Sequence, residues 1–197
     1  MNYIFQPCPT FGISEHPFAT WQGTFNDEEI QKIVEYAQAQ NAGDGRIGGD
    51  VCDPEYRRSQ VSWIPFNNDT AWIFDRLAWV TRNLNGQFYR FDLYGFCEPI
   101  QFTVYDESME GHYEWHQDSG TGHKDAPRKL SVVVQLSDPS EYEGGELELM
   151  TSKEPTQVLK QKGLAAAFPS YILHRVTPVT KGTRRTLVIW TSGPAFR

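Results

Sequence analysis

Three short motifs in this chain place a carboxylate two residues after a histidine, a spacing that suits a metal site. They are His112-Tyr-Glu114, His116-Gln-Asp118 and His123-Lys-Asp125. Two histidines and one carboxylate on one face of a non-haem iron leave its other positions open to substrate and oxygen. Because a pair with this spacing is common by chance, each motif has to be weighed by its surroundings.

The surroundings favour the motif that ends in Asp118. The last of the three lies in SGTGHKDAPRK, rich in glycine, proline and charge, which is typical of a solvated loop that would hold ligands poorly. His116 and Asp118 lie where the strand-like run GHYEWHQ ends, just before Ser119-Gly120 turns the chain. A strand end is rigid and opens onto solvent, as a metal that must admit oxygen requires.

The first motif remains an alternative. His112 and Glu114 lie inside the same strand-like run, and the two-residue period of a strand puts them on the same face as His116. A distant histidine must complete either set of ligands. His174, in the strand-like SYILHRVTPV, is the only histidine after residue 123.

Two adjacent arginines follow His174 by ten residues, in KGTRRTLVIW. A guanidinium binds a carboxylate through two hydrogen bonds, so an arginine facing the interior would hold a dicarboxylate cosubstrate. Strand alternation places either Arg184 or Arg185 inside. Both faces of this strand are apolar, so periodicity alone leaves the choice open.

The elements that must position these residues are of two kinds. Before about residue 87, the pattern of apolar and capping residues predicts helices. In FNDEEIQKIVEYAQAQ, Asn26 and Glu29 have the spacing of a capping box, and a second helix is predicted from about residue 69 to 84. Residues 41–59 are Gly-rich and predict a long loop of the kind that forms lids and binding loops.

From about residue 87 the texture changes to short β-branched and aromatic stretches separated by turn residues. At least eight such stretches occur, which predicts an all-β sandwich, jelly roll or barrel. They are QFYRFDLYG, IQFTVYD, GHYEWHQ, KLSVVVQLS, GGELELM, TQVLKQ, GLAAAFPS, YILHRVTPV and RRTLVIW. We expect one domain over residues 1–197, mainly β, with a helical part at about 1–86 and the β core at about 87–197.

Composition narrows the partners. The net charge of −7 weighs against a nucleic-acid partner, and no apolar run approaches the roughly 20 residues of a membrane span. The start of the sequence lacks the basic and apolar regions of a signal peptide. Cys8, Cys52 and Cys97 form no CxxC pair, so we expect reduced thiols and a cytoplasmic location.

From Tyr105 to Trp190 the order of motifs resembles the prolyl 4-hydroxylase group of Fe(II)/2-oxoglutarate dioxygenases, most closely its compact bacterial and phage members. The shared motifs are His-x-Asp, Gly-Gly-Glu-Leu, Phe-Pro-Ser, His-x-Val-x-Pro-Val and Gly-x-Arg, in that order. The resemblance implies a double-stranded β-helix core of the jelly-roll, cupin-like type. It assigns His116, Asp118 and His174 to iron.

The resemblance also assigns the remaining site residues. Arg184 would bind the distal carboxylate of 2-oxoglutarate, and Tyr105 would donate a hydrogen bond to it. Trp190 would line the mouth where the substrate ring lies. For both aromatic residues, simple core packing is the alternative. Some relatives have a tyrosine where this chain has Val134 and Gln135, which leaves the other polar contacts of the cosubstrate undefined.

The implied reaction is hydroxylation of a prolyl residue in a peptide or protein. It uses Fe(II), 2-oxoglutarate and O2, with ascorbate as a candidate reductant. One alternative is the same chemistry on a small metabolite or a modified base. An alternative of another class is a non-catalytic β-barrel binding module with structural histidines, which would have no need of Arg184.

Overall fold

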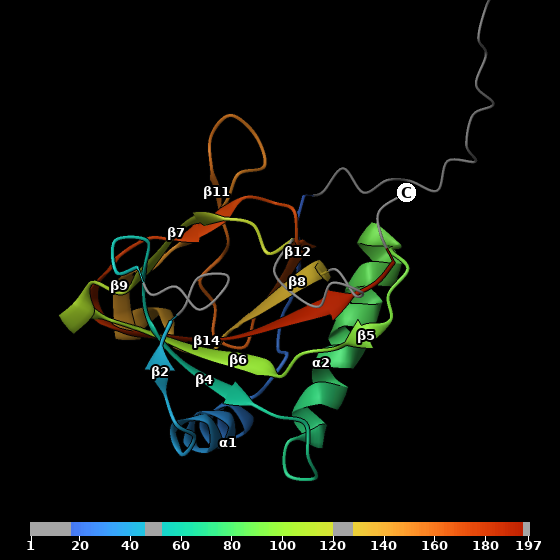
Figure 1. Ribbon diagram of the computed structural model, residues 1–197, viewed down its shortest axis with the longest axis horizontal. Coiled ribbons are helices and arrows are strands. Elements are labelled where there is room, and N and C mark those ends of the chain that lie inside the picture. The colour runs from blue at the N-terminus through green and yellow to red at the C-terminus, as the bar shows by residue number, and fades with distance from the viewer. Residues whose placement is uncertain (1–16, 46–52, 120–127, 195–197) are drawn as a thin grey trace, which may run out of the picture.

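A computed structural model describes residues 17–45, 53–119 and 128–194 of the chain. Within these residues, two antiparallel sheets lie one above the other, and two helices cover the outer face of the larger sheet (Figure 1). The arrangement agrees with the predicted jelly roll. No helix in these ranges is both long and apolar enough to cross a membrane.

The main sheet has the strand order β1-β12-β8-β14-β6-β4-β2, and β5 and β9 also pair with β14. Its strands are β1 (Ala19–Trp21), β2 (Gly43–Asp44), β4 (Gln60–Ile64), β5 (Gly95–Phe96), β6 (Ile100–Asp106), β8 (Arg128–Gln135), β9 (Tyr142–Gly144), β12 (Ala165–Pro169) and β14 (Val179–Ser192). The smaller sheet has the order β11-β10-β13-β7-β3. Its strands are β3 (Arg57–Arg58), β7 (His112–His116), β10 (Leu147–Leu149), β11 (Thr156–Gln157) and β13 (His174–Val176).

Two apolar clusters sit on opposite faces of the main sheet. The outer cluster packs helices α1 (Asp27–Gln38) and α2 (Ala71–Leu84) onto the sheet, and Leu187 and Ile189 of β14 belong to it. The inner cluster lies between the sheets, and Val188 packs against it. Strand alternation therefore turns Arg184, which shares the face of Val188, toward the interior of the sandwich.

The first helix forms as predicted. The Asn26 side chain accepts a 2.9 Å hydrogen bond from the backbone N–H of Glu29, and the Glu29 carboxylate accepts one of 3.0 Å from the N–H of Asn26. This capping box supplies partners for amide groups that the first helical turn leaves unpaired. The second helix begins at Ala71, close to the predicted start.

The β core was predicted to lie within residues 87–197, but the main sheet also contains earlier strands. β1 pairs with β12, and β4 pairs with β6. The predicted strand at 87–95 is also wrong. A π-helical turn, Asn85–Tyr89, occupies its first part, and residues 90–94, between this turn and β5, are not in a strand. The Asn85 side chain bonds both the N–H and the C=O of Phe91, which turns the chain out of the helix.

The predicted 41–59 loop contains two short strands, β2 and β3, one near each end. Its residues 46–52 lie outside the described residues, and so does the motif His123-Lys-Asp125. Cys8 and Cys52 also lie outside them, whereas Cys97 is an exposed free thiol.

Candidate metal centre

Two paired strands of the smaller sheet bring the two favoured histidines together. In the antiparallel register of β7 and β13, His116 lies directly opposite His174, with ring centroids 4.1 Å apart. Asp118 follows two residues after the end of β7. Its Oδ1 lies 3.8 Å from Nε2 of His116, and its Oδ2 lies 3.5 Å from Nε2 of His174. Within the described ranges, these three residues form the one cluster with metal-ligand geometry.

In each histidine, Nδ1 faces a backbone carbonyl and Nε2 faces the Asp118 carboxylate. Nδ1 of His116 donates to the carbonyl of Glu114 at 2.7 Å, and Nδ1 of His174 donates to the carbonyl of Ile172 at 2.9 Å. Because Nδ1 carries the proton in this arrangement, the lone pair is left on Nε2, where a metal ion would bind. Burial and the neighbouring His174 lower the pKa of His116 to about 3, so its imidazole is neutral.

The carboxylate is fixed from two directions. The Ser131 hydroxyl of β8 donates a 2.6 Å hydrogen bond to Oδ2 of Asp118, and the backbone N–H of Asp118 donates to the carbonyl of Ser170 at 2.9 Å. Burial alone would raise the pKa of Asp118. The neighbouring His174 and His116 and the Ser131 hydrogen bond outweigh that effect and lower it. The cluster therefore presents one carboxylate oxygen and two imidazole nitrogens, which is the donor set that suits Fe(II).

The first motif has a different environment. Nδ1 of His112 lies 2.9 Å from the carbonyl of Glu110, and its Nε2 lies 3.2 Å from the carbonyl of Glu55. Both ring nitrogens face backbone carbonyls, and His112 does not belong to the metal-ligand cluster. His112 ties β7 to the segment before β3, which is a structural role.

The adjacent arginines point to opposite faces of β14. Arg184 is 3% exposed and lines a small cavity in the inner cluster, whereas Arg185 lines a separate hollow together with Asp106. Nη1 of Arg184 is buried and has no hydrogen-bond partner among the residues that the structure describes. A buried guanidinium N–H without a partner suits a ligand carboxylate, so this position fits 2-oxoglutarate.

The surroundings of Arg184 include Tyr105, which the resemblance assigned to the cosubstrate, and further polar groups. Tyr105 lies opposite it on β6, with the guanidinium carbon 5.4 Å from the ring centre. Gln135 donates a 2.9 Å hydrogen bond to the hydroxyl of Tyr142, and both line the same cavity. Ser131 and Gln135 share the inner face of β8, so the two-residue period of KLSVVVQLS could have identified them as inward polar residues.

Trp190 lies at the end of the inner face of β14, opposite Ser131 on β8. It is 5% exposed. The guanidinium of Arg128 stacks on its ring at 3.6 Å, and the Trp63 ring lies 6.4 Å away. Ser131, which lies opposite Trp190, donates the hydrogen bond to the Asp118 carboxylate, so Trp190 lies near the metal cluster. Because the resemblance predicts that Trp190 lines the mouth of the site, we call the cluster of Trp63, Arg128 and Trp190 the mouth.

Comparison with known proteins agrees with this geometry. Residues 100–192 match the model of the 2OG-Fe(II) oxygenase superfamily, a stretch that contains all three residues of the cluster and Arg184. Over these residues the chain is similar to the 2OG-Fe(II) oxygenase superfamily, and the His116, Asp118 and His174 cluster lies within the similar stretch.

Its curated relatives are PKHD-type hydroxylases. One from Prochlorococcus marinus is 40% identical over 95 residues, which is 46% of this chain and 41% of that relative. Another, from Pseudoalteromonas atlantica, is 28% identical over 171 residues, covering 81% of this chain and 72% of the relative. The chain thus spans less than half the length of the first of these relatives.

Solved structures with the same fold include prolyl hydroxylases. A prolyl hydroxylase from Trichoplax adhaerens, in complex with a peptide fragment of hypoxia inducible factor, has a TM-score of 0.74 at 17% identity and covers 90% of this chain and 84% of its own. A Pseudomonas putida prolyl-4-hydroxylase has a TM-score of 0.72 at 18% identity, covering 90% of this chain and 93% of its own. These similarities confirm the predicted double-stranded β-helix.

Proposed function

We propose that the protein uses Fe(II), 2-oxoglutarate and O2 to hydroxylate a prolyl residue within a peptide or protein. The observation that carries the proposal is the pairing of two features in one sandwich. The His116, Asp118 and His174 cluster offers three donors to a metal. On the same inner face, the buried Nη1 of Arg184 has no partner among the described residues.

In this proposal each group has one task. Nε2 of His116, a carboxylate oxygen of Asp118 and Nε2 of His174 hold the iron. Arg184 holds the distal carboxylate of 2-oxoglutarate, with Tyr105 beside it. When bound, iron and 2-oxoglutarate supply the oxidation: O2 gives one oxygen atom to the substrate C–H bond and one to succinate, and carbon dioxide leaves.

The protein itself orients and encloses the reactants. The Nδ1 hydrogen bonds of the two histidines fix their rings, and Ser131 fixes the carboxylate. The apolar residues around Arg184 keep water from the carboxylate that it binds, which strengthens that ion pair. Trp190 offers a flat wall beside the metal centre, against which a pyrrolidine ring can stack.

Two observations support a prolyl substrate. Similar structures include proteins described as prolyl hydroxylases, one of them bound to a peptide fragment, and the curated relatives are named hydroxylases. The mouth is aromatic, with Trp190 and Trp63 6.4 Å apart. Aromatic walls favour proline-containing segments, which are already extended and cost little entropy to bind.

The test is to incubate the enzyme, loaded with iron and 2-oxoglutarate, with a library of proline-containing peptides and with cell extract. Mass spectrometry should find a gain of one oxygen, and fragmentation should place it on proline. The reaction is run with and without ascorbate, and the His174→Ala variant is the control. Turnover of free small molecules alone, or oxygen on another residue, would contradict the prolyl substrate and leave the oxygenase chemistry intact. Peptide binding without any turnover would favour a non-catalytic binding module.

A further inference from the structure

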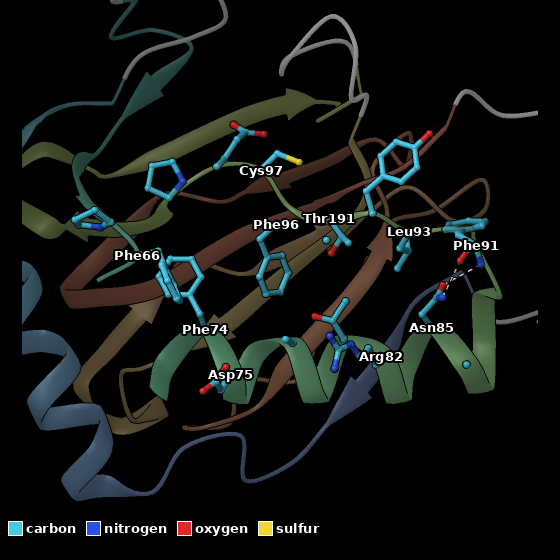
Figure 2. Close-up of a pocket in the computed structure, with 18 residues that line it drawn as sticks. Phe66, Phe74, Asp75, Arg82, Asn85, Phe91, Leu93, Phe96, Cys97 and Thr191 are labelled. Atoms are coloured by element: carbon cyan, nitrogen blue, oxygen red, sulfur yellow. Dashed lines mark hydrogen bonds between the residues drawn. The ribbon is translucent and has the colours of Figure 1, made fainter. Parts of the chain in front are cut away.

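A hollow of about 850 Å³ lies on the outer face of the main sheet, apart from the metal centre. Helix α2 forms one wall, Pro65 and Phe66 after β4 form a second, and residues 91–99 form a third (Figure 2). Its volume is in the range of pockets that bind ligands. We call it the α2 pocket. Nothing described so far uses it.

Aromatic side chains dominate the lining. They are Phe66, Phe74, Phe91, Tyr94 and Phe96. Phe66 is 69% exposed and Tyr94 is 67% exposed. Large aromatic side chains that gather at the edge of a hollow indicate an interaction surface, whereas exposed apolar residues scattered singly do not.

Two polar groups in the lining lack partners. The hydroxyls of Thr81 on α2 and Thr191 on β14 belong to side chains that are each 2% exposed. Neither hydroxyl has a hydrogen-bond partner among the described residues. Buried polar groups are usually paired, so a ligand with a polar tip is the expected partner here.

The α2 pocket lies back to back with the mouth. Thr191 lines the pocket, while its neighbour Trp190 faces the interior of the sandwich, because consecutive residues of a strand point to opposite faces. Glu98 on the pocket rim forms an ion pair with Arg128, which stacks on Trp190. The pocket and the mouth therefore meet at the end of the main sheet.

Aromatic residues mark a path around that end. Trp190 in the mouth lies 6.4 Å from Trp63, and Phe66 follows Trp63 by three residues. The Phe66 ring then contacts that of Phe74 at 5.3 Å, and Phe74 lies 6.4 Å from Phe96 inside the pocket. A free small molecule bound in the pocket would have no need of this connection, whereas a chain that passes from the mouth to the pocket would follow it.

We propose that the α2 pocket binds an aromatic side chain of the polypeptide substrate, a few residues from the proline in the mouth. The proposal rests on the proposed function, since it takes the proline as the group bound at Trp190. A strand advances about 3.3 Å per residue and packed layers lie about 10 Å apart, so at least about three residues separate the two anchors. The ring of tyrosine or tryptophan fits the aromatic walls, and its polar edge reaches Thr81 or Thr191.

The test is a binding selection, which requires no turnover. Displayed 14-residue peptides with a fixed central proline and random flanks are selected anaerobically on the enzyme loaded with Fe(II) and 2-oxoglutarate. Enriched peptides should carry an aromatic residue at one spacing from the proline. The enriched peptides should bind the Ala78→Trp variant, in which the new side chain fills the pocket from α2, at least about 10-fold more weakly than wild type. The Phe66→Ala variant should weaken binding by a similar factor, because it removes an anchor contact. Because Phe66 is exposed, its variant stays informative if Ala78→Trp fails to fold.

The matched control is Trp79→Ala. Trp79 is 52% exposed on the same helix but lines a different hollow with Trp21, so peptide affinity should not change. A second measurement locates the bound peptide. Cys97 lines the pocket and is exposed, so an enriched peptide should slow its alkylation by iodoacetamide. The same peptide with alanine in place of its aromatic residue should not slow it.

The outcomes separate the two proposals. Enriched peptides that show no aromatic preference, or that bind Ala78→Trp and Phe66→Ala as well as wild type, overturn the α2 pocket proposal even if proline is hydroxylated. Failure to enrich any peptide overturns it too, as does a pocket that takes only free aromatic molecules. Pocket-dependent binding that survives replacement of the proline by alanine, without hydroxylation, contradicts the proposed function instead.

Discussion

The Ser131 hydroxyl donates a 2.6 Å hydrogen bond to Oδ2 of Asp118, so a strand of the main sheet fixes a carboxylate that follows a strand of the smaller sheet. The metal cluster thus depends on both sheets. If Asp118 binds the metal, Ser131→Ala should lower the affinity for Fe(II) about 10- to 100-fold, as loss of a partner behind a ligand does.

Anaerobic Fe(II) titration measures this change. Ser62→Ala is the matched control, because its buried hydroxyl donates to the carbonyl of Ala37, far from the cluster along the chain, and metal affinity should stay the same. Equal affinities for wild type and Ser131→Ala would mean that the carboxylate is positioned without this hydrogen bond.

The choice between the histidine motifs gives a second prediction. His174→Ala removes a ligand and should abolish both tight Fe(II) binding and turnover, as should His116→Ala and Asp118→Ala. His112→Ala should keep tight metal binding, because both of its ring nitrogens face backbone carbonyls. The loss of those contacts should lower its thermal stability instead. Weak Fe(II) binding by a folded His112→Ala variant would contradict this assignment. We also expect His123→Ala, outside the described residues, to keep full turnover.

The adjacent arginines give a third prediction. Arg184→Ala should raise the KM for 2-oxoglutarate about 10- to 100-fold, because a charged hydrogen bond to a buried carboxylate contributes about 1.5 to 3 kcal/mol. Arg185→Ala is the natural control, since Arg185 lines a hollow on the other face of β14. Steady-state kinetics with varied 2-oxoglutarate measures both. The opposite pattern would require the other arginine to bind the cosubstrate.

Gly145, of the Gly-Gly-Glu-Leu motif, gives a fourth prediction. Its φ is +63°, and a Cβ built there would lie 2.9 Å from Cδ of Arg184. Gly145→Ala should therefore displace Arg184 and raise the KM for 2-oxoglutarate. The backbone strain, about 1 to 3 kcal/mol, should also lower the melting temperature by several degrees.

Gly43→Ala is the control for that substitution, because a Cβ at Gly43 meets nothing within 4 Å. Its melting temperature and KM should match those of the wild type. If Gly145→Ala has an unchanged KM but a lower melting temperature, the glycine serves the fold and not the position of Arg184.

Much of the site could be predicted from residue types and spacing. His116 and Asp118 could be identified because they lie at the end of a strand-like run, just before a turn. His174 could be identified because no other histidine follows residue 123. The direction of Arg184 could not be predicted from alternation. Both faces of β14 are buried, one by helices and one by the second sheet, so each face reads as apolar.

The remaining differences come from side-chain hydrogen bonds that the alternation of residue types does not reveal. The run 87–95 alternates like a strand, yet the side chain of Asn85 turns the chain there through bonds to the backbone of Phe91. Tyr142 joins Gln135 through a side-chain hydrogen bond that only the packing of the fold creates. No local pattern marks Tyr142 as a neighbour of Arg184, because the pairing of β9 with β14 brings it there.

The measurement that tests the central claim most directly is an anaerobic titration of the metal-free protein with Fe(II) and then 2-oxoglutarate, followed by visible absorption. Chelation of iron by 2-oxoglutarate in the His116, Asp118 and His174 site should produce a weak charge-transfer band that saturates at one iron and one 2-oxoglutarate per chain. Folded His174→Ala protein should not produce it, and Arg184→Ala should need more 2-oxoglutarate to reach it. Absence of the band in wild-type protein that binds Fe(II), or the same band in His174→Ala, would contradict the assignment of this cluster as an iron and 2-oxoglutarate site.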